Sequence, residues 1–275
     1  MQAKAIKGFT SIFLLLLLII MGCGPRLPKK ALERTKQVKI SYGKTDSELN
    51  IALTNLLKCP TRIIINSSKD LPWKIIQLKP QQDTVLNITW REAIPEISFG
   101  AEYGDPSIPV KDVPIEFPVS RKRDIRILQG YYGSLSHHQD MSKFALDFSL
   151  PVGDTLYAAT SGYVVEVVEG YKDGANEESW IEFGNKILFY NSASNRFFLY
   201  SHLVQKGSFV SPGEYIEAGQ PIGLSGNTGY SSKPHLHFAV LIADKLPGGL
   251  TSVPFDFVGG YKGEQFRTNS VLPKQ

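Results

Sequence analysis

The stretch Ser225-Gly-Asn-Thr-Gly-Tyr-Ser-Ser-Lys-Pro-His-Leu-His-Phe238 combines a glycine-rich turn with a pair of histidines. The turn ends at Pro234 and leads into an apolar, strand-like run over residues 235–242. Side chains in a strand alternate between its two faces, so His235 and His237 project from the same face. Two imidazoles about 7 Å apart on one rigid face form half of a metal site. The alternative interpretation is a surface strand that carries two histidines by chance.

Short strands separated by turns are also predicted for the rest of the chain. Apolar segments at 62–66, 73–78 and 84–90 follow one another at intervals of roughly ten residues, which is typical of a small antiparallel sandwich. Further along, residues 185–190 and 196–202 flank a polar turn, as in a β-hairpin. No long amphipathic helix is evident after the N-terminal apolar segment. The sequence therefore predicts an all-β protein.

A proline-rich connection at residues 104–114 predicts a domain boundary near residue 115. We expect a β-sandwich-like domain over residues 38–115, a second antiparallel β-sheet domain over 116–265 and a C-terminal tail over 266–275. The first domain contains no cluster of His, Asp or Cys that could carry out chemistry, so its expected role is spacing or binding.

The N-terminus has the pattern of an export signal. Lys4 and Lys7 precede an uncharged apolar run over residues 12–20, which is too short to span a membrane comfortably. This run leads into Ile20-Met21-Gly22-Cys23, which resembles the lipobox of bacterial lipoprotein signals. An uncleaved signal anchor is the alternative interpretation.

The lipobox resemblance implies a signal peptide over residues 1–22 and acylation of Cys23. The protein would then be a membrane-anchored lipoprotein, and residues 23–37 would form a charged tether that contains two prolines. With Cys23 acylated, Cys59 has no disulfide partner inside the chain. We therefore expect Cys59 to be a small buried hydrophobe.

The composition is that of a folded globular chain with a small net charge. Of the 275 residues, 42% are hydrophobic and 20% are charged, which argues against extensive disorder. The formal net charge is +4, and no dense basic patch is interleaved with aromatic residues, so no nucleic-acid partner is predicted. The mild positive charge is compatible with an anionic cell wall or membrane surface.

All histidines of the chain lie in the second predicted domain, where they could form a metal site together with an aspartate. In residues 144–150, alternation places apolar side chains on one face and Asp147 among small residues on the other. Zinc favours nitrogen and carboxylate ligands, and a catalytic zinc site keeps three protein ligands plus a water. The five histidines are His137, His138, His202, His235 and His237.

Several segments of this domain resemble the lysostaphin/LytM-type zinc endopeptidases. The similarity covers about residues 125–258, and its motifs follow the order and spacing of that family. It implies a lysostaphin/LytM-type antiparallel β-sheet peptidase domain. The segments are 144–165, Tyr200-Ser-His-Leu203, Gly219-Gln-Pro-Ile-Gly223 and Gly226-Asn-Thr-Gly-Tyr-Ser-Ser-Lys-Pro-His-Leu-His-Phe238.

The resemblance also implies a role for each matching residue. Asp147 and His237 would be zinc ligands. His235, the first histidine of the His-x-His pair, would be the general base that deprotonates the attacking water. His202 would stabilise the developing oxyanion.

The first ligand is where this sequence departs from the common family pattern. Many members place a histidine four residues before the aspartate, and that position here is Lys143. We predict that His138, nine residues before Asp147, is the first ligand, with His137 as the second choice. A further departure is Lys233, which stands where a glycine is usual and is expected on the rim of the groove.

The implied function is a membrane-anchored zinc endopeptidase that cleaves stem or cross-bridge peptides of peptidoglycan in the cell envelope. Its implied cofactor is Zn²⁺, and its partners would be peptidoglycan, the membrane through Cys23, and a regulatory protein. One alternative is an inactive relative that binds the wall and activates a separate hydrolase. Another is a structural lipoprotein whose histidines store metal.

Overall fold

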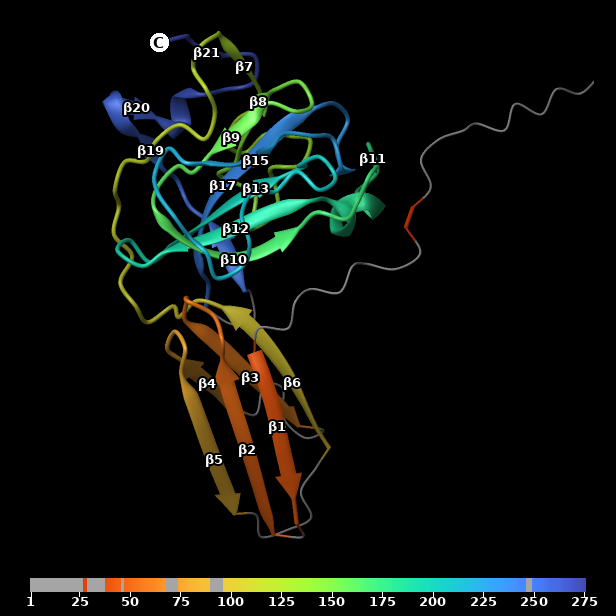
Figure 1. The fold of residues 1–275 in the computed structure, drawn as a ribbon, viewed down its shortest axis with the longest axis vertical. Coiled ribbons are helices and arrows are strands. Elements are labelled where there is room, and N and C mark those ends of the chain that lie inside the picture. The colour runs from red at the N-terminus through yellow and green to blue at the C-terminus, as the bar shows by residue number, and fades with distance from the viewer. Residues whose placement is uncertain (1–26, 29–37, 46, 68–73, 90–95, 246–248) are drawn as a thin grey trace, which may run out of the picture.

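In the computed structural model, the chain is described at residues 27–28, 38–45, 47–67, 74–89, 96–245 and 249–275 (Figure 1). Strands dominate these residues and the helices among them are short 3₁₀ turns, which confirms the all-β prediction. No helix in the described ranges has the length and apolar character needed to cross a bilayer. The predicted signal peptide and Cys23 lie outside the described residues.

Two three-stranded antiparallel sheets precede the larger sheet (Figure 1). Burial in β2 alternates, and its inward residues Leu49, Ile51 and Leu53 share one apolar core with Ile63 and Ile65 of β3. The two sheets therefore pack face to face. The first sheet has the order β1-β2-β5, with β1 at Val38–Lys44, β2 at Glu48–Asn55 and β5 at Asp83–Thr89. The second has the order β4-β3-β6, with β3 at Thr61–Ser67, β4 at Lys74–Leu78 and β6 at Ile97–Tyr103.

A nine-stranded sheet organises the rest of the described chain. Its order is β14-β10-β12-β13-β17-β8-β7-β21, and β18 also pairs with β17. β12 and β13 form the predicted hairpin. The bounds are β7 Ile125–Gln129, β8 Leu146–Ser149, β10 Gly162–Val168, β12 Lys186–Asn191, β13 Arg196–Ser201, β14 Tyr215–Ile216, β17 His235–Ala243, β18 Leu250–Ser252 and β21 Val271–Leu272.

Small two-stranded sheets and 3₁₀ turns surround this sheet. β9 (Thr155–Tyr157) pairs with β15 (Pro221–Leu224), and β19 (Asp256–Phe257) pairs with β20 (Tyr261–Lys262). β11 (Gly174–Ala175) and β16 (Gly229–Tyr230) pair in parallel. The 3₁₀ turns are η1 (Glu178–Phe183), η2 (Val258–Gly260) and η3 (Gly263–Gln265).

β17 separates its histidines from its apolar side chains, as the alternation predicts. Leu236, Phe238 and Val240 are fully buried in the main core cluster on one face of the sheet. Because successive side chains point to opposite faces, His235 and His237 project from the other face. The core thus anchors the strand that presents the two imidazoles.

A second apolar cluster lies on the histidine face of the sheet. It includes Ala239 and Leu241 of β17 together with Cys59 from the connection between β2 and β3. Cys59 is buried and has no disulfide, and burial raises the pKa of its thiol. The prediction of a small buried hydrophobe at this position is confirmed.

Strand register places one row of side chains across five neighbouring strands. Asp147 of β8 pairs with His237 of β17, and His237 pairs with Ser201 of β13. Ser201 pairs with Lys186 of β12, which in turn pairs with Val168 of β10. Directly paired residues share a face, so this row runs over the histidine side of the sheet.

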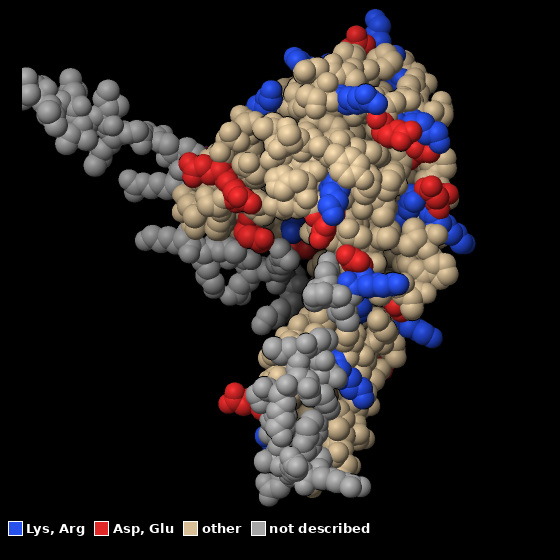
Figure 2. Space-filling view, turned by 180° about the vertical axis from the view of Figure 1, so that it is seen from behind, with Lys and Arg blue, Asp and Glu red and all other residues tan. Residues whose placement is uncertain are grey.

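Charged side chains are dispersed over the molecular surface. On the face drawn in Figure 2, Lys and Arg side chains lie interspersed with Asp and Glu. This distribution agrees with the small formal net charge of +4.

Candidate active site

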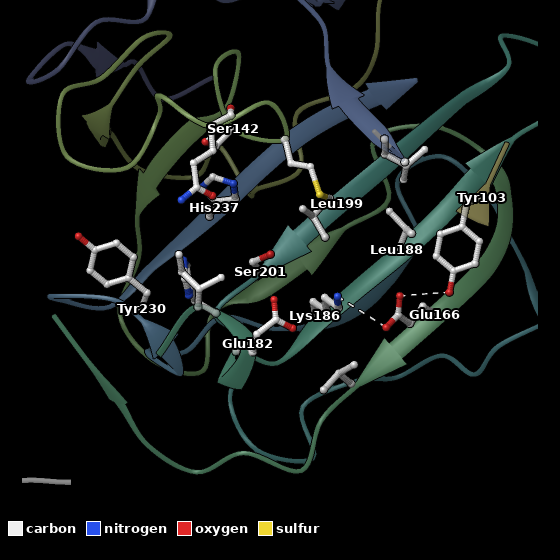
Figure 3. A pocket seen from close by; sticks show the side chains of 18 of the residues that line it. Tyr103, Ser142, Glu166, Glu182, Lys186, Leu188, Leu199, Ser201, Tyr230 and His237 are labelled. Carbon is white, nitrogen blue, oxygen red and sulfur yellow. Dashed lines mark hydrogen bonds and ion pairs between the residues drawn. The ribbon is translucent and has the colours of Figure 1, made fainter. Parts of the chain in front are cut away.

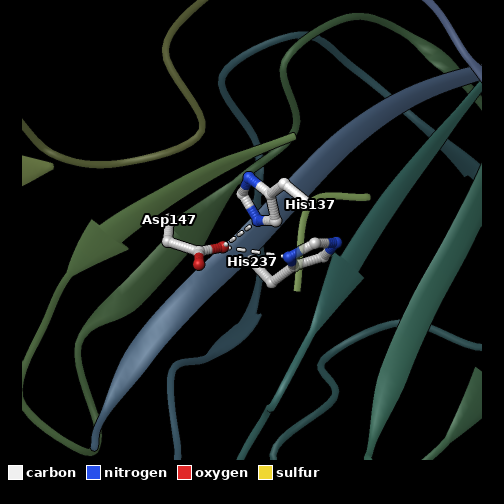
Figure 4. Close-up of side chains that lie close together, drawn as sticks. All are labelled: His137, Asp147 and His237. Atoms are coloured by element: carbon white, nitrogen blue, oxygen red, sulfur yellow. Dashed lines mark hydrogen bonds and ion pairs between the residues drawn. The ribbon is translucent and has the colours of Figure 1, made fainter. Parts of the chain in front are cut away.

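Three side chains that are distant in the sequence meet on the histidine face of the large sheet (Figure 4). His137 comes from the loop between β7 and β8, Asp147 from β8 and His237 from β17, and one ligand atom of each lies within 4.8 Å of the others. Asp147 Oδ1 is 3.2 Å from His137 Nε2 and 2.9 Å from His237 Nδ1. The direct pairing of His237 with Asp147 fixes two of these three positions through the backbone.

The backbone orients the ring of His137, which is fully buried. Its Nδ1 lies 2.7 Å from the carbonyl oxygen of Gly130. A carbonyl only accepts hydrogen bonds, so Nδ1 carries a proton and Nε2 is the ring nitrogen that faces Asp147. A hydrogen bond of this kind behind the ring is usual for metal-binding histidines.

Gln129, at the end of β7, holds both the aspartate and the loop that carries His137. Its Nε2 donates to Asp147 Oδ2 at 3.0 Å and to Ser136 Oγ at 2.9 Å. Its Oε1 accepts from the backbone N–H groups of Leu135 and Ser136, at 2.9 and 3.2 Å. Only 3% of Gln129 is exposed, so its whole amide is satisfied inside the protein. Gln129 was not among the residues predicted for the site, although it stands in phase with the buried isoleucines of β7, an unusual place for a polar residue.

Two further histidines face the cluster. His235 Nδ1 lies 2.8 Å from the carbonyl oxygen of Lys233, and His202 Nδ1 lies 2.7 Å from that of Thr228. Both rings therefore carry the proton on Nδ1 and have Nε2 as an acceptor. The two ring centroids are 4.5 Å apart, and His235 Nε2 is 3.8 Å from Asp147 Oδ1.

A tight backbone arrangement supports His202. Its φ of +68° lies in the left-handed region, which is uncommon for residues other than glycine and frequent at functional sites. The backbone N–H of fully buried Asn185 donates to Thr228 Oγ1 at 3.0 Å, which fixes the segment whose carbonyl accepts from His202. Gly229 has a φ of +77°, and a Cβ there would lie 2.6 Å from Gly184 Cα. The glycine-rich turn before β17 is thus required by close backbone approach.

The charges of the site are arranged around an ionised aspartate. Burial by itself would raise the pKa of Asp147, but the facing His235 and His137 rings hold it well below its usual range. Burial and the neighbouring His235 and His237 lower the pKa of His202 well below its usual value, and burial lowers that of His237. Burial also opposes protonation of His137, yet the charge and hydrogen bond of Asp147 outweigh it and raise the pKa. At neutral pH, His202 and His237 are therefore neutral beside a carboxylate.

The structure does not bring His138, the first-choice ligand, into the cluster. Its side chain is exposed, whereas that of His137 is buried. The backbone N–H of His137 donates to Gly133 O at 3.1 Å, and this turn directs His137 inward and leaves the next residue to solvent. His137, the second choice, lies in the cluster instead. Lys143 takes no part, because its ammonium pairs with Asp140 at 2.7 Å.

Two adjoining cavities open along the cluster. The larger has a volume of about 400 Å³ and extends from His237 to Tyr103 of β6 (Figure 3). The smaller, of about 100 Å³, is lined by His235 and by Lys233, the predicted rim residue. His202 lines both cavities. An extended substrate bound at the cluster could therefore continue into a cavity on each side of it.

The donor set of His137, Asp147 and His237 fits a zinc ion. Two imidazole nitrogens and one carboxylate oxygen are usual ligands of catalytic zinc. Ligand atoms at about 2.0–2.1 Å from a tetrahedral ion are separated from one another by about 3.3 Å. The observed separations of 3.2 and 2.9 Å from Asp147 Oδ1 are close to that value.

A comparison with protein families identifies the domain that carries this site. The family described as Peptidase family M23 matches residues 142–247, a segment that contains Asp147, His202, His235 and His237. The chain contains a peptidase family M23 domain. The family predicted from the sequence is thus confirmed, and His137 lies just before the matched segment of the M23 domain.

Relatives of the M23 domain include known peptidases. Lysostaphin of Staphylococcus simulans is 36% identical over 99 residues, which are 36% of this chain and 18% of lysostaphin. Peptidoglycan DD-endopeptidase ShyA of Vibrio cholerae is 36% identical over 96 residues, which are 35% of this chain and 19% of that protein. The chain thus spans about a fifth of these two relatives. Among solved structures, the catalytic domain of lysostaphin is 25% identical, with a TM-score of 0.33 and coverage of 48% of this chain and 88% of that domain.

Proposed function

We propose that this chain is a zinc-dependent endopeptidase that hydrolyses peptide bonds in peptidoglycan. The observation that carries the proposal is the meeting of His137, Asp147 and His237, faced by His202 and His235, where two cavities adjoin. The substrate class is supported by the relative from Vibrio cholerae, which is a peptidoglycan DD-endopeptidase.

The proposed metal ligands are His137 Nε2, an oxygen of Asp147 and His237 Nδ1. A bound zinc ion supplies a Lewis acid that polarises the scissile carbonyl and lowers the pKa of water to about 7. Gln129 keeps Asp147 oriented by binding its second oxygen. Residues that hydrogen-bond to a metal ligand typically contribute about 10- to 100-fold in metal affinity or activity.

His235 is the proposed general base. Its Nδ1 proton is bound to the carbonyl of Lys233, so Nε2 is the atom that can take a proton from the attacking water. The imidazolium that results carries a proton on Nε2 and can donate it to the nitrogen of the leaving amine. Proton transfer by a positioned side chain typically contributes about 10²- to 10⁴-fold in rate.

The hydrogen bond of His202 favours a role that differs from the one implied by the family resemblance. Its Nδ1 proton is bound to the carbonyl of Thr228, so the neutral ring has no proton on Nε2 to donate to an oxyanion. We propose that Nε2 of the neutral His202 ring accepts a hydrogen bond from the attacking water and helps to orient it beside His235, whose ring centroid is 4.5 Å away.

We further propose that the enzyme is a lipoprotein of the cell envelope. In this arrangement residues 1–22 are removed, Cys23 is acylated and residues 23–37 tether the folded part to a membrane. The sandwich-like part over 38–115 and the peptidase part over 116–265 would then both face the periplasm or cell wall, where peptidoglycan lies.

Removal of the metal is expected to stop the hydrolysis of purified sacculi. The full chain in detergent micelles should release muropeptides in the presence of zinc and lose at least about 100-fold of this rate after chelation, because the Lewis acid is gone. Stoichiometric zinc should restore the rate. Mass analysis of the released muropeptides measures the rate and identifies the bond that is cut.

A chain that is loaded with zinc and releases nothing from sacculi would contradict this proposal. Binding to sacculi without cleavage would then favour the inactive, wall-binding alternative. The His235→Ala variant serves as the control for contaminating hydrolases, since it should bind zinc and show no rescue by added metal.

A further inference from the structure

The N-terminal strands pack onto the same face of the large sheet that carries the active site. Leu57 and Cys59 lie in one apolar cluster with Leu188, Phe197 and Leu241 of the large sheet. The two parts of the chain thus share a core, and Figure 1 shows the ends of β3 and β6 next to the large sheet. The N-terminal part therefore covers one portion of the face and leaves the portion around His237 open.

A buried arginine fixes this contact. Arg62 of β3 is fully buried and donates through Nη1 to the carbonyl of Asp244 at 2.6 Å and through Nη2 to that of Gly249 at 2.7 Å. Glu102 of β6 pairs with Arg62 Nη2 at 3.1 Å and accepts from the N–H of Gly249 at 3.1 Å. Charge-assisted hydrogen bonds of this kind are among the strong ones, so they hold β3 and β6 against Asp244 and Gly249.

The larger cavity runs from the active site to this contact. Its floor contains Ser201 and Lys186 in the row of His237, and Leu199 and Leu188 in the next row (Figure 3). β17 and β10 are three strand spacings apart, which is about 14 Å at ~4.8 Å per spacing. An extended peptide rises about 3.3 Å per residue, so the cavity has room for about four residues.

Tyr103 of β6 stands at the far end of the cavity (Figure 3). Its hydroxyl donates to Glu166 Oε2 at 3.2 Å, and its ring lies 6.3 Å from that of Phe197. Glu166 is only 6% exposed, and its Oε1 lies 3.6 Å from Lys186 Nζ. The end of the cavity is thus made of groups that are held by both parts of the chain.

We propose that Tyr103, presented by the N-terminal part, is the end wall of the substrate groove. The wall limits the substrate to about four residues on that side of the scissile bond. The preferred substrates are therefore cross-linked peptides whose chain ends within this distance on one side, and links inside a longer cross-linked chain are cut slowly. This inference rests on the proposed function and concerns the same groove.

The proposal that Tyr103 ends the groove is tested by identifying the first products formed from linear muropeptide tetramers. A tetramer offers cross-links at its ends and one internal link, and only an end link has a short chain on the restricted side. The full wild-type chain is expected to release monomer and trimer first, with dimers formed at less than about a tenth of that rate. Tyr103→Ala should bring the two rates within about twofold, and Tyr103→Phe, which keeps the ring, should retain the wild-type ratio.

A binding measurement that does not depend on cleavage accompanies this test. Tyr103→Trp keeps an aromatic wall and places a fluorophore in it, and muropeptide dimers are expected to change its emission with saturation. Tyr42→Trp, at an exposed position of β1, is the matched control, and its response should not exceed that of the wild-type chain with its three native tryptophans.

Together, the two measurements distinguish a failure of the Tyr103 proposal from a failure of the proposed hydrolase function. A saturable response of Tyr103→Trp without any cleavage by the wild type would support the wall and contradict the hydrolase. Equal cleavage of all links together with a silent Tyr103→Trp would overturn the wall and leave the hydrolase standing. Neither cleavage nor response would contradict both.

Discussion

His137→Ala is expected to reduce the zinc content of the purified chain from about one ion to less than about 0.1, and sacculus hydrolysis by more than about 100-fold. The reason is that His137 is fully buried, with Nε2 3.2 Å from Asp147 Oδ1, so its removal takes away one of three ligands. His138→Ala should change neither quantity by more than about twofold, because this side chain is exposed. Zinc is measured by mass spectrometry of the metal and hydrolysis by released muropeptides.

These two variants form a matched pair. The residues are adjacent and of one type, so both substitutions remove the same atoms from the same turn. Zinc loss in His138→Ala with normal zinc in His137→Ala would show that the original sequence prediction is right and that the loop is arranged differently in the metal-bound protein. Equal zinc in both variants would remove the loop from the metal site altogether.

His235→Ala is expected to keep about one zinc ion per chain and to lose about 10²- to 10⁴-fold in hydrolysis. His235 Nε2 is 3.8 Å from Asp147 Oδ1, farther than either proposed ligand nitrogen, and its Nδ1 is bound to the carbonyl of Lys233. The substitution therefore removes a proton acceptor and leaves the ligands in place. Zinc content and the initial rate on sacculi are measured on the same preparation.

The matched control for this variant is Lys233→Ala. It leaves the Lys233 carbonyl that orients His235 and removes only an exposed side chain on the rim of the smaller cavity. Its rate should stay within about threefold of wild type. If His235→Ala lost its zinc as well, His235 would be a ligand, and the base would have to be sought in His202.

The sequence predicts the fold class and half of the site because both follow from strand alternation. With Leu236 and Phe238 committed to the core, His235 and His237 have only one face on which to lie, and the same holds for Asp147 in β8. Pairing of β8 with β17 then brings Asp147 opposite His237. The family resemblance implied that Asp147 and His237 share one metal ion, whereas alternation alone does not say which strands are neighbours.

The remaining features depend on contacts that a local pattern does not contain. His137 and His138 are neighbours in a turn, where the direction of each side chain is set by single hydrogen bonds and not by a strand period. The role of Gln129 depends on the loop that it binds, which folds back over β7, and this fold is not visible in the local sequence. Arg62 binds backbone carbonyls 182 and 187 residues away, so its role in holding β6 beside the groove was beyond sequence analysis.

The central claim is that His137, Asp147 and His237 hold one metal ion on the face of the large sheet. A crystal of the zinc-loaded chain, recorded at the zinc absorption edge, tests it most directly. We predict one anomalous peak at about 2.0–2.2 Å from His137 Nε2, His237 Nδ1 and an oxygen of Asp147. A peak bound through His138, or no peak between β8 and β17, would contradict the claim.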